Sequence, residues 1–192
     1  TCALPICSLV TAGAQVAIVG RDPHRVAASA ADLDGGSGRV TGWAIDLAAP
    51  DALDGLGRIG EHLTEVDVVI ASAAVMSAKA SKLAHTSPAH WREVLATNLD
   101  GVFHTLRAFV PGMLERRSGR VVVFSACLGR MSGPGNAGGL APYRVSKAAV
   151  NALVRNTAAE AGAGRRGVFV DAVCPGHCRT DMGGPDAPRS PE

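Results

Sequence analysis

Short runs of β-branched residues alternate with longer amphipathic stretches along this chain, and no other feature constrains its fold as strongly. We expect strands over 15–19, 39–45, 66–72, 120–125 and 168–173, and helices over 22–33, 51–63, 87–96, 101–116 and 143–162. A parallel crossover needs a connection about the size of a helix. The order of the elements therefore predicts an α/β fold, a Rossmann-like doubly wound parallel sheet covered by helices.

Residues that directly follow the strands are the first candidates for a binding site. In doubly wound sheets, ligands lie beyond the carboxyl ends of the strands. The positions in question are Arg21, Asp46, 72–75, Ser125, Pro175 and Gly176.

Length and composition limit the possible classes of protein. The 192 residues, 47% of them hydrophobic, suit a single domain with one sizeable core. The net charge of +2 comes from acids and bases spread along the chain, so no patch indicates nucleic acid or an anionic membrane. The apolar runs are too short to cross a bilayer. Free thiols in a reducing cytoplasm and no metal site are expected from the spacing of the cysteines, which are Cys2, Cys7, Cys127, Cys174 and Cys178.

The two ends of the chain lack this pattern. The first six residues, Thr-Cys-Ala-Leu-Pro-Ile, match the translation of a common sequencing-library adapter, although a chance apolar N-terminus would read the same way. We therefore expect residues 1–12 to be an artefact or irregular, residues 13–185 to form the domain, and residues 186–192 to be a loop or tail.

The only tyrosine of the chain, Tyr143, lies four residues before Lys147 and directly after Pro142. Proline suits the first turn of a helix, and residues four apart lie on one helix face. A neighbouring ammonium group favours the phenolate and is expected to lower the pKa of the tyrosine. Because a Tyr and a Lys at this spacing are common on helices, the pair needs support from its context.

That context resembles the short-chain dehydrogenase/reductase family. Tyr143-Arg-Val-Ser-Lys147 is similar to the family's YxxxK motif, and Thr97-Asn98-Leu-Asp-Gly-Val-Phe103 to its asparagine segment. Pro175-Gly176 followed by Thr180 resembles the family's PG motif and its cofactor-contacting threonine. These matches occur in the family's order and extend from about Gly13 to Pro185.

The resemblance implies a reaction and roles for particular residues. Tyr143 would be the general acid or base at a carbonyl or alcohol, with hydride exchanged by a nicotinamide cofactor. Lys147 would lower the pKa of the tyrosine and hold the nicotinamide ribose, and Asn98 would support a water relay to that lysine. The cofactor would also contact Pro175, Gly176 and Thr180.

The cofactor preference is indicated by the end of the first strand. Arg21 there resembles the NADP-preferring members, because a guanidinium can pair with the adenosine 2′-phosphate, whereas an acid at this place favours NAD. Alternatively, Arg21 is a solvated residue beside Asp22, which would be a helix N-cap. Asp46 matches the residue that contacts adenine in the family, with a plain turn aspartate as the alternative.

The sequence also departs from the family. It lacks the family's first strand with its glycine-rich phosphate loop, and the last strand; the GxxxGxG at 129–135 lies elsewhere and is expected to be a loop near the substrate. Ala126 stands at the catalytic serine position, with Ser125 one residue early as the candidate substitute and Ser132 a weaker one. The usual Asn-Asn-Ala-Gly appears as Ala-Ser-Ala-Ala at 71–74, and His177 is expected to be a loop residue.

We therefore expect an NADP(H)-dependent oxidoreductase that interconverts a carbonyl and an alcohol, with impaired activity in this chain. The alternative is a catalytically degenerate member of the family that binds a nucleotide or a partner. A small-molecule substrate, a homo-oligomer formed through the helices at 101–116 and 143–162, and a cytoplasmic location are implied by the resemblance.

Overall fold

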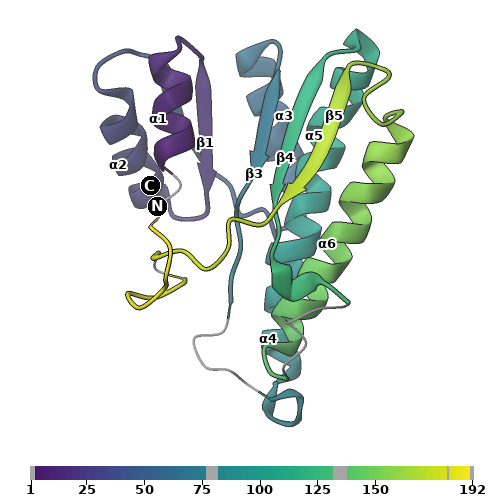
Figure 1. The fold of residues 1–192 in the computed structure, drawn as a ribbon. Helices are drawn as coiled ribbons and strands as arrows, with labels where there is room; N and C mark the ends of the chain where they lie inside the picture. Colours follow the sequence, from purple (N-terminus) through teal and green to yellow (C-terminus); the bar gives the residue numbers. More distant parts are fainter. Residues whose placement is uncertain (1–2, 77–81, 132–137, 181, 191–192) are drawn as a thin grey trace.

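The computed structural model describes residues 3–76, 82–131, 138–180 and 182–190, and it contains two parallel sheets side by side (Figure 1). The first sheet pairs β1 (Val16–Gly20) with β2 (Val40–Ala44). The second has the order β3 (Val68–Ala71), β4 (Gly119–Phe124) and β5 (Val168–Val173). The predicted strands and their parallel arrangement are confirmed.

One helix that was not predicted comes before the first strand, and the other helices follow the strands in the predicted order. The helices are α1 (Ala3–Thr11), α2 (Pro23–Asp34), α3 (Ala52–Leu63), α4 (Pro88–Leu95), α5 (Gly101–Arg116) and α6 (Ala141–Glu160). Helices α1 and α2 pack against the first sheet, α5 packs on β3 and β4, α6 packs on β5, and α3 contacts α5. Short helical turns lie at Leu83–His85, Ala96–Asp100 and Cys127–Gly129.

Local signals set several of these boundaries. The side chain of Asp22 accepts hydrogen bonds from the backbone N–H groups of His24 and Arg25, so it caps α2 as the sequence suggested. Gly35 ends that helix with a φ of 53°, in the left-handed region that suits glycine. Ser87 caps α4 in the same way, through the N–H of His90.

The hydrophobic core is unequal between the two sheets. A large cluster surrounds the second sheet and includes Val121, Val123 and Met113, none of which is exposed to solvent. A smaller cluster beside the first sheet has three buried members, Ile45, Leu56 and Ile59. The two sheets are thus supported to different degrees.

One feature differs from the sequence interpretation, and two others add to it. Residues 3–11, expected to be irregular, form α1, and they do not supply a strand beside β1. Within the described part of the chain, no strand pairs β1 with β3. No helix in the same part is long and apolar enough to cross a membrane.

Candidate functional site

The strands of both sheets point toward the same edge of the molecule (Figure 1). Phe124 ends β4 and Val173 ends β5, so Ser125 and Cys174 are the first residues past two neighbouring strands. The first turn of α6 carries Tyr143. This is the edge where doubly wound sheets bind ligands.

Tyr143 and Lys147 lie close together and are largely buried, with 8% and 2% of their surfaces exposed. The ammonium group of Lys147 is 5.9 Å from the centroid of the Tyr143 ring. It donates a hydrogen bond of 2.8 Å to the backbone oxygen of Phe124, which fixes α6 against the end of β4. The structure thus brings the two residues together as their spacing predicted.

The pKa directions of this pair differ from the expectation for the tyrosine. Burial raises the pKa of Tyr143, and negative charge on the thiols of Cys174 and Cys127 raises it further. Burial also lowers the pKa of Lys147 to about 8. The expected lowering of the tyrosine pKa is therefore wrong for the protein alone, because burial shifts this pKa upward.

Asn98 is fully buried and connects three parts of the fold. Its amide oxygen accepts the N–H of Val75 at 2.8 Å, and its amide nitrogen donates to the Val75 carbonyl at 3.0 Å. The same nitrogen donates to the hydroxyl of Ser146, also at 3.0 Å, and that hydroxyl donates to the carbonyl of Tyr143. Asn98 thereby joins the segment after β3 to the first turn of α6.

Asn98 lies in a helical turn that is wider than an α-helix. Residues Ala96–Asp100 form a π-helical turn between α4 and α5. Such turns are rare and are frequently found at functional sites. Helical periodicity alone does not reveal this turn, since the flanking segments both read as ordinary helix.

Ser125 is buried, and its hydroxyl donates a 2.5 Å hydrogen bond to the amide oxygen of Asn151. Asn151 lies two turns beyond Tyr143 on α6, and its amide nitrogen contacts the carbonyl of Gly129 at 3.4 Å. Ala126 has no hydroxyl to offer. The sequence interpretation overlooked Asn151, although its position eight residues after Tyr143 places it along the same helix face.

Two cysteines lie near Tyr143. From the sequence we predicted only that they are free thiols. The backbone N–H of Cys127 donates to the sulfur of Cys174 at 3.0 Å, which ties the turn after β4 to the end of β5. Both are exposed and free. Their order in the sequence gives no sign of this meeting, because it depends on the pairing of β4 with β5.

The loop after β5 contains the PG motif. Gly176 has a φ of 86°, and the guanidinium of Arg189 packs close to it and donates to the carbonyl of Pro175 at 3.2 Å. The hydroxyl of Thr180 accepts the N–H of Gly183, so it shapes the loop. The ring of His177 lies 2.8 Å from the carbonyl of Gly183. His177 is a loop residue here, as expected.

Arg21 and Asp46 lie at the ends of the strands of the first sheet and are both exposed. Asp46 accepts the backbone N–H of Ala48 at 3.0 Å, as a turn aspartate does. The loop residue Ser132 and the glycines 133 and 135 lie outside the described residues. In the described part of the chain, no cluster of three metal-ligating side chains occurs.

Comparison with known proteins matches this chain to one family model, described as short chain dehydrogenase, over residues 6–190. The chain is 32% identical over 183 residues to a galactitol 2-dehydrogenase (L-tagatose-forming) from Cereibacter sphaeroides, which covers 93% of the chain and 68% of that protein. It is 30% identical over 142 residues to a 3-oxoacyl-acyl-carrier-protein reductase from Vibrio cholerae, covering 73% of the chain and 55% of the reductase.

Solved structures resemble the fold over most of the chain. A putative gluconate dehydrogenase from Agrobacterium tumefaciens superposes with a TM-score of 0.80 at 26% identity, covering 92% of this chain and 67% of that one. A metagenomic short-chain oxidoreductase in complex with NADP gives a TM-score of 0.78 at 27% identity, covering 91% of this chain and 76% of its own.

Proposed function

This chain belongs to the short-chain dehydrogenase family, and on that premise we propose that it is an NADP(H)-dependent oxidoreductase that interconverts a carbonyl and an alcohol. The observation that carries the proposal is the buried pair of Tyr143 and Lys147 beyond the strand ends. A phenol and an ammonium side by side supply a proton and a positive field where a carbonyl oxygen gains negative charge.

In this mechanism Tyr143 handles the proton. The nicotinamide supplies hydride to the carbonyl carbon, or accepts it in the reverse direction. Because burial raises the pKa of Tyr143, its hydroxyl stays protonated at neutral pH and suits donation to the developing alkoxide oxygen. For alcohol oxidation the phenol must first lose its proton, and Lys147 is the cation beside it that favours this loss.

Several residues would hold the cofactor, and they fit its two ends. Lys147 carries three N–H donors, and within the described residues one of them has an acceptor, at Phe124. Two donors are left for ribose hydroxyls near Tyr143. Arg21 is exposed at the end of β1 and would pair with the 2′-phosphate, with Asp46 at the adenine and Pro175, Gly176 and Thr180 near the nicotinamide.

The residues described here suit the pyrophosphate, between the two ends of the cofactor, less well. A dinucleotide phosphate is usually held by a glycine-rich loop at a helix N-terminus. Among the described residues, no glycine-rich loop leads into a helix N-terminus at the carboxyl ends of β1 and β3. We therefore infer weak cofactor binding and low turnover in the chain as it stands.

We propose that the substrate is a small molecule, as for the family. The proposal specifies only its reacting group, a carbonyl or an alcohol. We also infer a homo-oligomer formed through α5 and α6. Their outer surfaces carry Phe103 and Val145, which are 47% and 44% exposed. We place the protein in the cytoplasm.

The test is NADPH oxidation with a panel of aldehydes and ketones, comparing the wild-type chain with Tyr143→Phe. Loss of the hydroxyl should reduce kcat by roughly 10²–10⁴-fold, the usual contribution of one general acid. Asn156→Ala, an exposed change on the same helix, is the matched control and should leave kcat unchanged. Equal turnover in Tyr143→Phe and the wild type would contradict the assignment.

A second candidate function is binding without chemistry, and one observation favours it. The hydroxyl of Ser125 is engaged by Asn151, and Ala126 stands where the family's serine is expected. Titration of intrinsic NADPH fluorescence separates binding from turnover. Saturable binding without turnover, unchanged by Ala126→Ser, would support the binding protein; a gain of turnover in Ala126→Ser would support the enzyme.

A further inference from the structure

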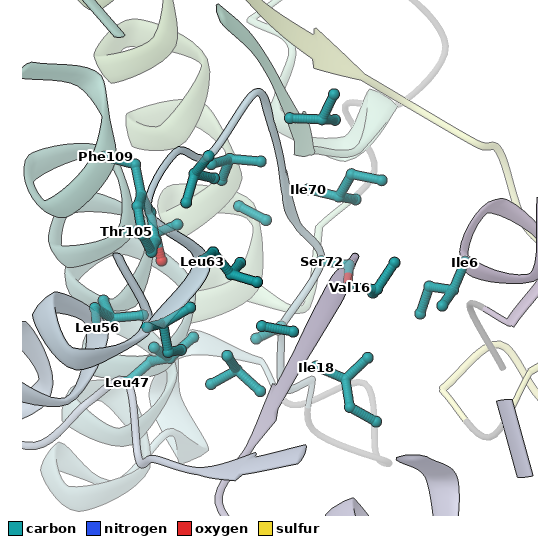
Figure 2. A pocket seen from close by; sticks show the side chains of 18 of the residues that line it. Ile6, Val16, Ile18, Leu47, Leu56, Leu63, Ile70, Ser72, Thr105 and Phe109 are labelled. Atoms are coloured by element: carbon teal, nitrogen blue, oxygen red, sulfur yellow. The ribbon is translucent and has the colours of Figure 1, made fainter. Parts of the chain in front are cut away.

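A cavity of about 570 Å³ lies between the two sheets, and apolar side chains such as Ile18, Leu56 and Phe109 line most of it (Figure 2). No cysteine is among the described residues that line it. Two cysteines come together elsewhere, past the ends of β4 and β5, at Cys127 and Cys174. We call these two residues the thiol pair.

The pairing of β4 with β5 brings the members of the thiol pair together. The register aligns the last residues of the two strands, Phe124 and Val173. Cys174 is the next residue after Val173, and Cys127 begins a short helical turn three residues after Phe124. The backbone N–H of Cys127 donates to the sulfur of Cys174 at 3.0 Å. Residues 47 positions apart in the sequence are thus in direct contact.

The separation of the thiol pair suits a disulfide bond. The Cα of Cys127 is one bond of about 1.46 Å from its nitrogen, so it lies within about 4.5 Å of the Cys174 sulfur. Cysteines can be bridged when their Cα atoms are about 4.4–6.8 Å apart, and neighbouring strands lie about 4.7–4.9 Å apart. Rotation about the Cα–Cβ bond of the exposed Cys127 brings its sulfur toward Cys174. A change of rotamer is therefore enough, and the strands can stay in place.

Both thiols of the pair are free and exposed, so a small oxidant reaches them from solvent. The other two described cysteines are placed differently. Cys7 lies on α1, which packs on α2 and β1. The thiol of Cys178 donates to the carbonyl of Pro175 at 3.5 Å, and its backbone pairs with Arg189. The thiol pair is thus the first choice for a bond between two cysteines of this chain.

We propose that Cys127 and Cys174 form a modification site, at which hydrogen peroxide joins the two sulfurs in a reversible disulfide bond. The thiolate of one cysteine attacks the peroxide, the O–O bond breaks, and a sulfenic acid and one water result. The second thiol then attacks the sulfenic sulfur, the S–S bond forms and a second water leaves. In sum, the two thiols lose two electrons and two protons, and the peroxide accepts them.

The thiol pair lies beside Tyr143, so its oxidation changes the surroundings of the residue proposed to handle the proton. Negative charge on the two thiols raises the pKa of Tyr143, and a disulfide carries no such charge. The bond also ties the turn at 127–129 to the end of β5, directly before Pro175. An effect on turnover rests on the proposed function, whereas formation of the bond does not.

The test uses the full chain, reduced first and then treated with a stoichiometric amount of hydrogen peroxide. After denaturation, free thiols are labelled with N-ethylmaleimide and counted by intact mass. Because the chain has five cysteines, one disulfide leaves three of them to be labelled. Dithiothreitol should restore the labelling of all five. Trypsin digestion without reduction should give the peptide 121–130 linked to the peptide 167–179.

Single substitutions identify the two partners. Cys127→Ser and Cys174→Ser should each keep all their remaining thiols free for labelling after peroxide. Cys178→Ser is the matched control, because Cys178 lies in the same tryptic peptide as Cys174, and this variant should still lose two thiols. Cys7→Ser should lose two as well. The linked peptide of the wild type tests the bond even where a variant fails to fold.

NADPH oxidation gives a second readout, which depends on the proposed function. In the oxidised wild type its rate should fall on the order of tenfold, since a shift of about 1 Å in a positioned group can cost about 10²-fold. Dithiothreitol should restore the rate. Cys174→Ser should keep its own untreated rate after peroxide, because it cannot form the bond.

Three results would overturn the modification site. Labelling of all five thiols after peroxide, or addition of oxygen atoms without a cross-link, would show that the pair does not join. A linkage kept in Cys174→Ser and lost in Cys178→Ser would assign the bond to Cys178. A dimer that dithiothreitol dissociates would show that the bond forms between two chains.

Two further results separate the bond from the proposed function. A disulfide that leaves turnover unchanged would contradict the effect on the surroundings of Tyr143. A disulfide in a chain that shows no turnover in either state would confirm the modification site and count against the oxidoreductase function.

Discussion

The two sheets of this protein are built from similar strands but are buried very differently. In the three-stranded half, β3, β4 and β5 with α5 and α6, Val121 and Val123 are completely buried. In the two-stranded half, β1 and β2 with α2 and α3, every residue of β1 is partly exposed. In this structure the strand paired on both sides, β4, is completely buried at these positions, whereas β1, paired on one side, is not.

This difference separates the two tasks assigned to the molecule. The residues proposed to handle the proton lie on the three-stranded half, where Asn98 and Lys147 form hydrogen bonds to backbone groups. Arg21 and Asp46, proposed for the adenosine end of the cofactor, lie on the two-stranded half. The residues proposed for the chemistry therefore lie in the more deeply buried half, and those proposed for the adenosine end lie in the more exposed half.

The largest effect is expected from breaking the polar connection in the three-stranded half. Asn98→Ala removes three hydrogen bonds and takes away the side-chain partner of the partly buried N–H and C=O of Val75, so the free energy of unfolding should fall by about 3 kcal/mol. Urea denaturation followed by circular dichroism measures this. Asn156→Ala, which removes an exposed asparagine from α6, should cost under about 0.5 kcal/mol. If both variants lost the same free energy of unfolding, the hydrogen bonds of Asn98 would not stabilise the fold.

A matched pair of valines compares the two halves directly. Val123→Ala in β4 should lower the free energy of unfolding by about 2–3 kcal/mol, because the buried site cannot collapse fully around the smaller side chain. Val19→Ala in β1, which is partly exposed, should cost about 1 kcal/mol or less. The same urea titration gives both values. A larger loss at Val19 would reverse the comparison drawn above.

Lys147→Met should stabilise the three-stranded half at the expense of the site. The pKa of this lysine falls from 10.5 to about 8 in the folded protein because burial disfavours the ammonium. Below pH 8 the fold carries a buried charge, and from pH 8 to 10.5 the unfolded chain holds more protons, so wild-type stability should rise with pH there. At pH 7 the variant should gain about 2 kcal/mol, after the lost hydrogen bond to Phe124 is subtracted.

Thermal melts at pH 7 and at pH 10 measure both parts of that prediction. The advantage of Lys147→Met should shrink between the two values. Lys82→Met changes an exposed lysine and should alter stability at neither pH. A variant less stable than the wild type at pH 7 would show that the hydrogen bond to Phe124 outweighs the cost of burial.

The smallest effect is expected in the two-stranded half, at Arg21. Arg21→Ser should weaken NADPH binding about tenfold, the equivalent of one charge-assisted contact, and leave NADH binding unchanged. Fluorescence titration with each nucleotide measures the two affinities. Arg25→Ser removes another exposed arginine from the same region and is the control for general charge. Equal weakening of NADPH in both variants would assign the effect to net charge.

Much of the fold follows from the sequence because its signals are local. The alternation of strand and helix patterns, the cap at Asp22 and the spacing of Tyr143 and Lys147 all depend on residues a few positions apart. Family membership follows from motifs in order along the chain. The sequence did not predict the helix at residues 3–11, because we interpreted that stretch from its similarity to a translated adapter and not from its helical periodicity.

The sequence by itself thus determined the parallel α/β class, the family and the pairing of Tyr143 with Lys147. Only the tertiary structure decided where long-range partners meet: Asn98 with Val75, Ser125 with Asn151, and Cys127 with Cys174. It also decided the direction of the Tyr143 pKa, because burial depends on every segment packed around the ring.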